Sequence, residues 1–385
     1  MNPLPKYCVI GFVIFFGSIH SASARPNISN AVGQMMMVGF NGTTINEQSP
    51  IVKAIKNYHI GGVILFDHFD KKNERKGMAR NISSPAQLKR LTKQLQYYAK
   101  KYHDAPLLIA LDQEGGMITV LKTEKGFKLD DNYSQQKLGE SNNQKEIYSQ
   151  VLYRADLLKR YGINLNLAPV ADLNLNPKNP SIGKLERSFG HDPIKVTKDL
   201  MASVEAYRKA RIFCTLKHFP GLGSSKTNTD VKVSDVTETW KMVELIPYRE
   251  LINRHQSCHF IMVAHTINRR LDKSGLEASL SHEIVTGLLR HHLHFRGIIM
   301  TDDMDAKAIR GHVATAKAIR LAVLAGNNMI LYGGTQGYDP KRDATELYNT
   351  MMQLAANNQE ARRDIFNSYR RILEVKKTLG ESQQR

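Results

Sequence analysis

Short apolar runs that alternate with amphipathic stretches constrain the fold of this chain more than any other feature. The runs are rich in Val, Ile and Leu and lie at residues 61–66, 107–112, 163–170, 212–218, 260–265, 297–302 and 328–332. Between them, residues 85–96 place Leu88, Leu91 and Leu95 on one helical face, and residues 314–325 carry Ala and Leu at helical spacing. Apolar strands separated by helices are typical of a parallel sheet that is buried on both faces.

Polar residues at the ends of these runs favour a closed barrel over an open sheet. They are Asp112, Asp172, Lys217 with His218, His265 and Asp302. Seven runs and an eighth strand expected near the start fit a (β/α)8 barrel, in which all these ends meet at one mouth. A doubly wound open sheet is the alternative. We therefore predict an α/β fold, a (β/α)8 barrel in a single domain over residues 25–375, followed by a polar C-terminal tail at 376–385.

The first 24 residues have the pattern of a secretory signal peptide. Lys6 precedes an apolar run at 7–19, and Ala22 and Ala24 are the small residues that a signal peptidase reads. We expect cleavage after residue 24 and a periplasmic or extracellular location; an uncleaved anchor is the alternative. An oxidising compartment permits a disulfide between Cys214 and Cys258, but both lie in or beside apolar runs, where buried thiols are common. The sequence leaves both states open.

The charge balance points to anionic surroundings. The chain has 54 Lys and Arg against 36 Asp and Glu, a formal net charge of +18. The basic residues are dispersed and are not interleaved with aromatic ones, so we expect no nucleic-acid partner, and a basic adhesion protein is the least favoured hypothesis. We expect instead a monomer that associates electrostatically with an anionic wall or membrane surface.

Three segments carry groups suited to chemistry. After the run 297–302 come Asp302, Asp303 and Asp305, and a carboxylate held at a strand end suits a nucleophile; a helix N-cap is the alternative. Lys217 and His218 precede a Pro-Gly loop, and Asp112 and Glu114 flank a turn with two glycines. Both segments can hydrogen-bond a polar ligand, or they are ordinary strand ends.

Two other features carry weaker signals. His291, His292 and His294 cluster, but no carboxylate or Cys completes a metal set, so we predict neither a metal nor a cofactor. Trp240 is the single Trp and either stacks on a sugar or packs at a helix start.

The ordered set of motifs resembles glycoside hydrolase family 3, in particular its single-domain bacterial exo-β-N-acetylglucosaminidases. It runs through GGVILF, ALDQEGG, NLAPVADLN, ERSFGHDP, LKHFPGLG, VAHTIN and GIIMTDDMDAKAI, from about residue 33 to about 335. The resemblance implies that Asp302 is the nucleophile of a retaining mechanism. It also implies that Asp112, Arg187, Lys217 and His218 contact the sugar.

The chain departs from this family where the acid/base group is expected. The loop that carries Asp-Ser-His in this branch reads Asn228-Thr229-Asp230 here, and Leu222 replaces the usual His. Met117 and Val120 stand at two family Arg positions. We therefore predict a secreted enzyme that removes terminal β-N-acetylglucosamine from peptidoglycan fragments or chito-oligosaccharides, with Asp230 as the acid/base. A degenerate barrel that binds amino sugars or the cell wall without turnover is the alternative.

Overall fold

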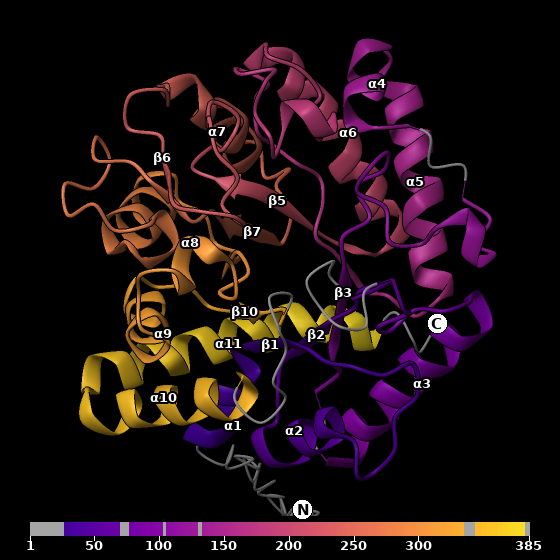
Figure 1. Ribbon diagram of the computed structural model, residues 1–385, viewed down its shortest axis with the longest axis vertical. Helices are drawn as coiled ribbons and strands as arrows, with labels where there is room; N and C mark the ends of the chain where they lie inside the picture. The colour runs from indigo at the N-terminus through magenta and orange to yellow at the C-terminus, as the bar shows by residue number, and fades with distance from the viewer. Residues whose placement is uncertain (1–26, 70–76, 103–104, 130–132, 335–342, 382–385) are drawn as a thin grey trace, which may run out of the picture.

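The strands close into a barrel. The structure is a computed structural model that describes residues 27–69, 77–102, 105–129, 133–334 and 343–381; the signal pattern at 1–24 lies outside them. Over these residues, eight parallel strands form one sheet in the order β10-β1-β2-β3-β4-β5-β7-β9. Met300 and Met329 form a parallel bridge that joins the sheet's two ends. The predicted (β/α)8 barrel is confirmed, with helices arranged around the strands (Figure 1).

The elements follow the predicted alternation. The barrel strands are β1 (Met36–Gly39), β2 (Gly62–Ile64), β3 (Leu108–Leu111), β4 (Leu165–Asn166), β5 (Phe213–Phe219), β7 (Phe260–Val263), β9 (Ile298–Thr301) and β10 (Ile330–Tyr332). The α-helices are α1 (Ile28–Gln34), α2 (Pro50–Tyr58), α3 (Pro85–Tyr102), α4 (Gln135–Glu140), α5 (Gln144–Arg160), α6 (Pro193–Ala210), α7 (Ile246–Asn253), α8 (Lys307–Arg310), α9 (Thr315–Leu324), α10 (Asp343–Asn357) and α11 (Gln359–Glu381). Shorter elements are η1 (Thr123–Lys125), η2 (Gly183–Leu185), η3 (Met242–Leu245), η4 (Ala278–Leu280), the π-helix η5 (Glu283–His292), β6 (Ser234–Asp235) and β8 (Thr266–Ile267).

The core is divided into buried clusters, and β7 contributes alternate side chains to two of them. In β7, Phe260 and Met262 belong to one buried cluster, whereas Ile261 and Val263 belong to another that includes side chains of α5, α6 and α7. Successive side chains of a strand point to opposite faces, so an apolar run contributes to both clusters. This is why the strands read as continuous apolar runs. Among the described residues, no helix is both long and apolar enough to cross a membrane.

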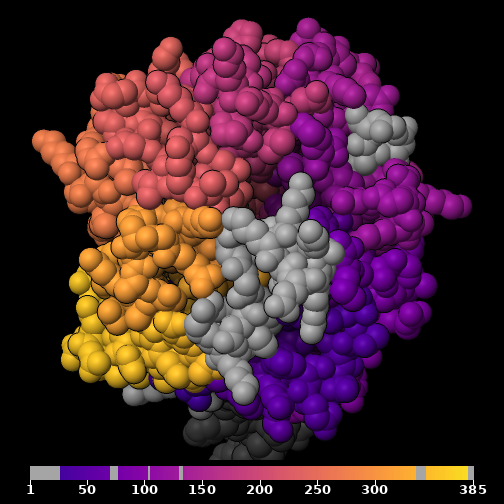
Figure 2. Space-filling view, in the orientation of Figure 1, coloured from indigo at the N-terminus to yellow at the C-terminus, as the bar shows by residue number. Residues whose placement is uncertain are grey.

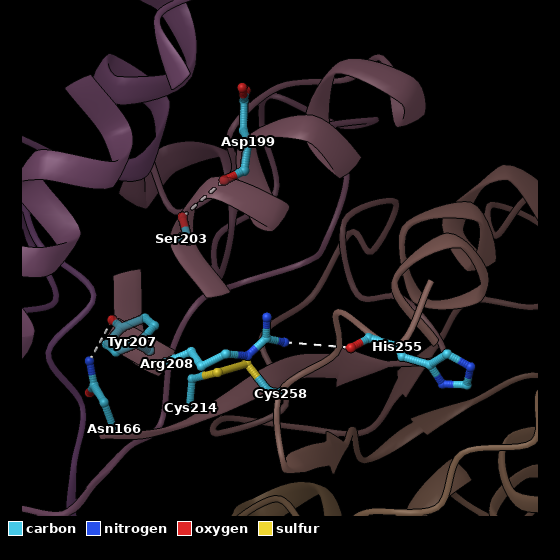
Figure 3. The surroundings of a disulfide bond; sticks show 8 residues. All are labelled: Asn166, Asp199, Ser203, Tyr207, Arg208, Cys214, His255 and Cys258. Atoms are coloured by element: carbon cyan, nitrogen blue, oxygen red, sulfur yellow. Dashed lines mark hydrogen bonds between the residues drawn. A yellow bond between two sulfur atoms is a disulfide. The ribbon is translucent and has the colours of Figure 1, made fainter. Parts of the chain in front are cut away.

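Strand β4 is shorter than the apolar run that contains it. Asn164 Oδ1 accepts a hydrogen bond from Ile109 N (2.7 Å), and Asn166 Nδ2 donates to Gln113 O (2.9 Å) and Tyr207 Oη (2.8 Å; Figure 3). Side-chain amides therefore take over part of the strand pairing. Pro169 has no N–H to donate, so the ladder is interrupted there before Val170 forms an isolated parallel bridge with Lys217.

Cys214 of β5 and Cys258, just before β7, form a disulfide across neighbouring strands (Figure 3). Their Cα atoms are 5.1 Å apart and the cysteines are separated by 44 residues in the sequence. The structure thus answers a question that the sequence leaves open. Both residues are buried, so the bond lies beneath the helices rather than on the surface.

Breaking this disulfide is expected to lower the free energy of unfolding. A cross-link restricts the unfolded chain, and removing a native one typically costs about 2–4 kcal/mol. Urea unfolding of Cys258→Ser should show this loss, and reduced wild-type protein should match the variant. Equal stability of oxidised wild type and variant would contradict the prediction.

The C-terminal segment differs from the expected polar tail at 376–385, because α11 continues to Glu381. Lys376 is fully buried, and its Nζ donates to Gln34 Oε1 (2.6 Å) and to Gly61 O (2.7 Å). Gln34 and Gly61 directly precede β1 and β2, so the amine anchors α11 to the end of the barrel where strands begin. Burial lowers the pKa of Lys376 to about 7.

Lys376 is expected to make stability rise with pH above neutrality. Between a folded pKa of about 7 and an unfolded pKa of about 10.4, the unfolded chain binds more protons, so the free energy of unfolding increases with pH. The test is to measure the free energy of unfolding of wild type and of Lys376→Met at about pH 7 and at about pH 9.5. Its increase between these pH values should be larger in the wild type than in the variant, by up to a few kcal/mol. Parallel pH dependences would refute this assignment.

Candidate active site

The carboxyl ends of the barrel strands surround a cavity of about 380 Å³. This volume is within the range of small-molecule sites, about 300–1,000 Å³. All the residues proposed from the sequence lie in its lining: Asp112, Arg187, Lys217, His218, Asp230 and Asp302. Figure 2 shows, in the orientation of Figure 1, segments from the beginning, the middle and the end of the chain side by side on this face.

Asp302 is held rigidly where β9 ends. Its backbone N–H donates to Val263 O (2.9 Å), and its Oδ1 accepts from Asp303 N (2.8 Å). Burial alone raises the pKa of this carboxyl, but electrostatic interactions with His218 and His265 and the hydrogen bond from Asp303 N outweigh burial, so the pKa lies below its usual range. Asp302 is therefore ionised at neutral pH, as a nucleophile must be.

Asp230 lies at the rim of the same cavity, in the loop between β5 and β6. Thr229 O accepts from Ala308 N (3.0 Å), which ties the loop to α8, and Asn228 Oδ1 accepts from Asp230 N (2.8 Å). The side chain of Asp230 reaches solvent, yet loss of hydration against the cavity wall, followed by repulsion from Asp302, raises its pKa. Asp230 and Asp302 are thus shifted in opposite directions, which separates an acid from a nucleophile.

Glu114 joins the cationic side chains of the site, a role that sequence reasoning missed. It accepts from Arg187 Nε (2.7 Å) and Nη2 (2.7 Å) and pairs with Lys217 Nζ (2.7 Å), while Lys217 also donates to Asp112 (2.6 Å). Burial raises the pKa of a carboxyl, but Arg187 and Lys217 lower that of Glu114 to about 2. The two glycines after Glu114, at φ of 100° and 60°, make the tight turn.

Asp172 orients His218. Its Oδ2 lies 2.7 Å from His218 Nδ1, and its Oδ1 accepts from Leu222 N (2.7 Å). The side chain of Asp172 is buried, so these contacts fix both the imidazole ring and the start of the loop after β5. His218 Nε2 lies 3.3 Å from Arg187 Nη2. The sequence places Asp172 at a strand end but does not indicate that it supports His218.

The acids after β9 have separate roles in the structure. Asp303 accepts from Gly333 N (2.8 Å) and Asp305 N (3.0 Å), and burial together with Asp305 raises its pKa to about 7. Asp305 pairs with Arg310. His265 contacts the turn after β9, since its Nε2 lies 3.0 Å from Asp303 O.

The residues with weaker signals lie elsewhere. Trp240 is buried and its Nε1 donates to Pro220 O (3.1 Å), so it packs behind the Pro-Gly loop rather than in the cavity. His291, His292 and His294 are exposed at the end of η5. Within the described part of the chain, no group of three or more His, Cys, Asp or Glu is arranged to hold a metal ion.

At the departures from the family pattern, apolar side chains take the place of polar ones. Leu222 is buried against Val170 and Ile182, and Val120 lines the cavity. Met117 is 57% exposed.

Comparison with known proteins defines the family. The model for the glycosyl hydrolase family 3 N-terminal domain matches residues 27–375, and the chain belongs to this family. The chain is similar to a "Beta-hexosaminidase A" of Pseudoalteromonas piscicida, with 29% identity over 96% of this chain and 64% of that protein. It is 31% identical to a "Beta-hexosaminidase" of Nitrosomonas eutropha, over 77% of this chain and 79% of that protein.

A solved structure of a family 3 β-N-acetylglucosaminidase from Paenibacillus sp. superposes with a TM-score of 0.82 at 29% identity, covering 92% of this chain. The chain spans 63% of that structure's length and 64% of the Pseudoalteromonas protein.

Proposed function

We propose that this protein is a retaining exo-glycosidase that removes terminal β-linked N-acetylglucosamine. The observation that carries the proposal is the pair of carboxyl groups in one cavity, Asp302 with a lowered pKa and Asp230 with a raised pKa. Relatives named β-hexosaminidases support the substrate class. Peptidoglycan fragments or chito-oligosaccharides are the proposed natural substrates.

The proposed mechanism uses these carboxyl groups in two steps. In the first, an Asp302 oxygen attacks C1 of the sugar while the Asp230 proton passes to the leaving oxygen, which breaks the glycosidic bond. In the second, the Asp230 carboxylate takes a proton from water, whose oxygen attacks C1 and displaces Asp302. Two inversions at C1 give a sugar of retained β configuration.

The remaining polar groups of the cavity would bind the sugar. Lys217 and Arg187 donate charge-assisted hydrogen bonds, and Asp112 accepts them. Because Glu114 already pairs with both cations, it sets their positions before the ligand arrives.

Hydrolysis of an aryl β-N-acetylglucosaminide, with the product anomer followed by NMR, tests this proposal. We expect turnover with β-anomer released first. Comparison of N,N′-diacetylchitobiose with a muropeptide as substrate identifies the natural class. Binding of N-acetylglucosamine in calorimetry without any turnover would instead support the degenerate barrel.

We also propose that the protein is exported. The signal pattern at 1–24 and the Cys214–Cys258 disulfide support export, because structural disulfides persist mainly in oxidising compartments. Mass spectrometry of the mature protein from the periplasm should find a chain that begins at residue 25.

A further inference from the structure

A second cavity, of about 630 Å³, lies at the opposite end of the barrel. Its walls are the segments that precede β7 and β9, so it opens on the face where strands begin. Polar side chains of its lining are those of Asn253, His255, Ser257, His294 and Arg296. Among the residues that the structure describes, no Asp or Glu lines it.

Arginine side chains donate hydrogen bonds to four backbone carbonyl groups of the cavity wall. Arg290 Nη1 donates to Phe295 O and to Gly297 O (3.0 Å), and Arg371 donates to Arg296 O. Figure 3 shows Arg208 reaching from beside the disulfide towards His255 O, at 3.5 Å. Four carbonyl oxygens of the wall are therefore engaged, and the guanidinium groups of Arg290, Arg371 and Arg208 lie directly behind it.

Each of the polar side chains that line the cavity can donate a hydrogen bond. Ser257 Oγ is buried without a hydrogen-bond partner, and Arg296 and His294 are exposed at the edge. Burial, followed by repulsion from Arg371, lowers the pKa of Arg290 to about 9. Positive charges that are crowded together in this way are stabilised by a bound anion.

Helices that end at this face add to its positive charge. The last turns of α2, α3, α5, α6 and η5 carry Lys56, Lys100, Lys101, Lys159, Arg160, Arg208, Lys209 and Arg290. Each cation also stabilises its own helix dipole. Of these cations, Arg208 and Arg290 contact the wall of the second cavity. Their summed field attracts anions to it.

We propose that this cavity binds a phosphate group. Arginine, imidazole, hydroxyl and amide donors around one space suit an oxyanion with several acceptor oxygens. The phosphate comes either from a soluble phosphate ester or from an anionic lipid headgroup. In the second case the face rests on the membrane while the catalytic mouth points away from it. This inference does not depend on the proposed glycosidase activity.

Titration calorimetry of the full chain with inorganic phosphate and with glycerol phosphate tests the site. The double variant Arg296→Glu, His294→Ala should bind at least about ten-fold more weakly than wild type. Lys198→Glu, a charge reversal on the exposed side of α6, is the matched control and should bind as wild type does. Both variants should keep the wild-type circular dichroism spectrum and aryl-glycoside hydrolysis rate. Equal binding by wild type and double variant, or no binding by either, overturns the proposal.

Sedimentation with vesicles separates the two sources of phosphate. If the ligand is a headgroup, phosphatidylglycerol vesicles should retain wild type and Lys198→Glu but release the double variant, while phosphatidylcholine vesicles retain none. Binding of phosphate esters in calorimetry without vesicle retention assigns the site to a soluble ester. Equal vesicle retention of wild type and double variant, together with equal binding of esters, refutes the site.

Discussion

Asp302→Ala is expected to lower kcat/KM for an aryl β-N-acetylglucosaminide by about 10⁴-fold or more, because in the proposed mechanism this residue forms the covalent intermediate. Removal of a nucleophile in other enzymes costs up to about 10⁶ in kcat. The binding network of Arg187, Glu114 and Lys217 remains intact, so KM should change little. The measurement is a steady-state assay with the substrate in excess.

Rescue by a small anion makes this test specific. Azide can occupy the space that the carboxylate leaves and attack C1 from the same face. The product is then an α-glycosyl azide, and the configuration is inverted because only one displacement occurs. A matched control is Asp303→Asn, which changes a neighbouring carboxyl of the same cavity that accepts from Gly333 N and Asp305 N; azide should not rescue any loss it causes. An unchanged rate in Asp302→Ala would exclude the proposed mechanism.

Asp230→Asn is expected to slow hydrolysis of N,N′-diacetylchitobiose by about 10²–10⁴-fold, the usual contribution of general acid–base catalysis. An aryl leaving group with a low pKa needs little protonation to leave C1, so kcat/KM for the aryl substrate, which reports the first step, should be affected far less. The ratio of the two effects is the diagnostic quantity. A similar loss on both substrates would indicate that Asp230 positions the loop instead of transferring a proton.

The pH profile gives an independent readout of Asp230. Because its pKa is raised, Asp230 stays protonated at pH values above the usual range for an Asp. The decline of kcat/KM on the alkaline side of the profile then reports the ionisation of Asp230. This decline should disappear in Asp230→Asn. Asp235→Asn is the control: Asp235 is an exposed carboxyl in β6 that pairs with Arg269, and its removal should leave the profile as in wild type.

The positions of the strands could be predicted from the sequence because burial on both faces demands continuous apolar runs. The structure brings Asp112, Lys217, His218 and Asp302 together for the same reason, since parallel strands end at one mouth. The role of Glu114 could not be predicted, because either carboxyl of the turn could have faced inward. Only the three-dimensional fold brings Arg187, 73 residues away, against it.

The end of α11 and the pairing of β6 with β8 also depend on distant partners. Residues after 375 are mostly polar, and nothing local indicates that Lys376 is buried. Its partners Gln34 and Gly61 lie more than 300 residues earlier in the chain. Strand β6 has two residues, and its partner β8 follows β7, so no periodic pattern marks either.

The pairing of β1 with β10 determines when the barrel can close during folding. β1 pairs with both β2 and β10, which are the nearest and the most remote strands in sequence, and Lys376 of α11 donates to Gln34 just before β1. A nascent chain therefore exposes an unpaired strand edge at β1 until nearly the whole polypeptide has been made. Truncation before β10 should leave that edge open to pairing between molecules, so the segment from β10 to the C-terminus also protects the first strand from aggregation.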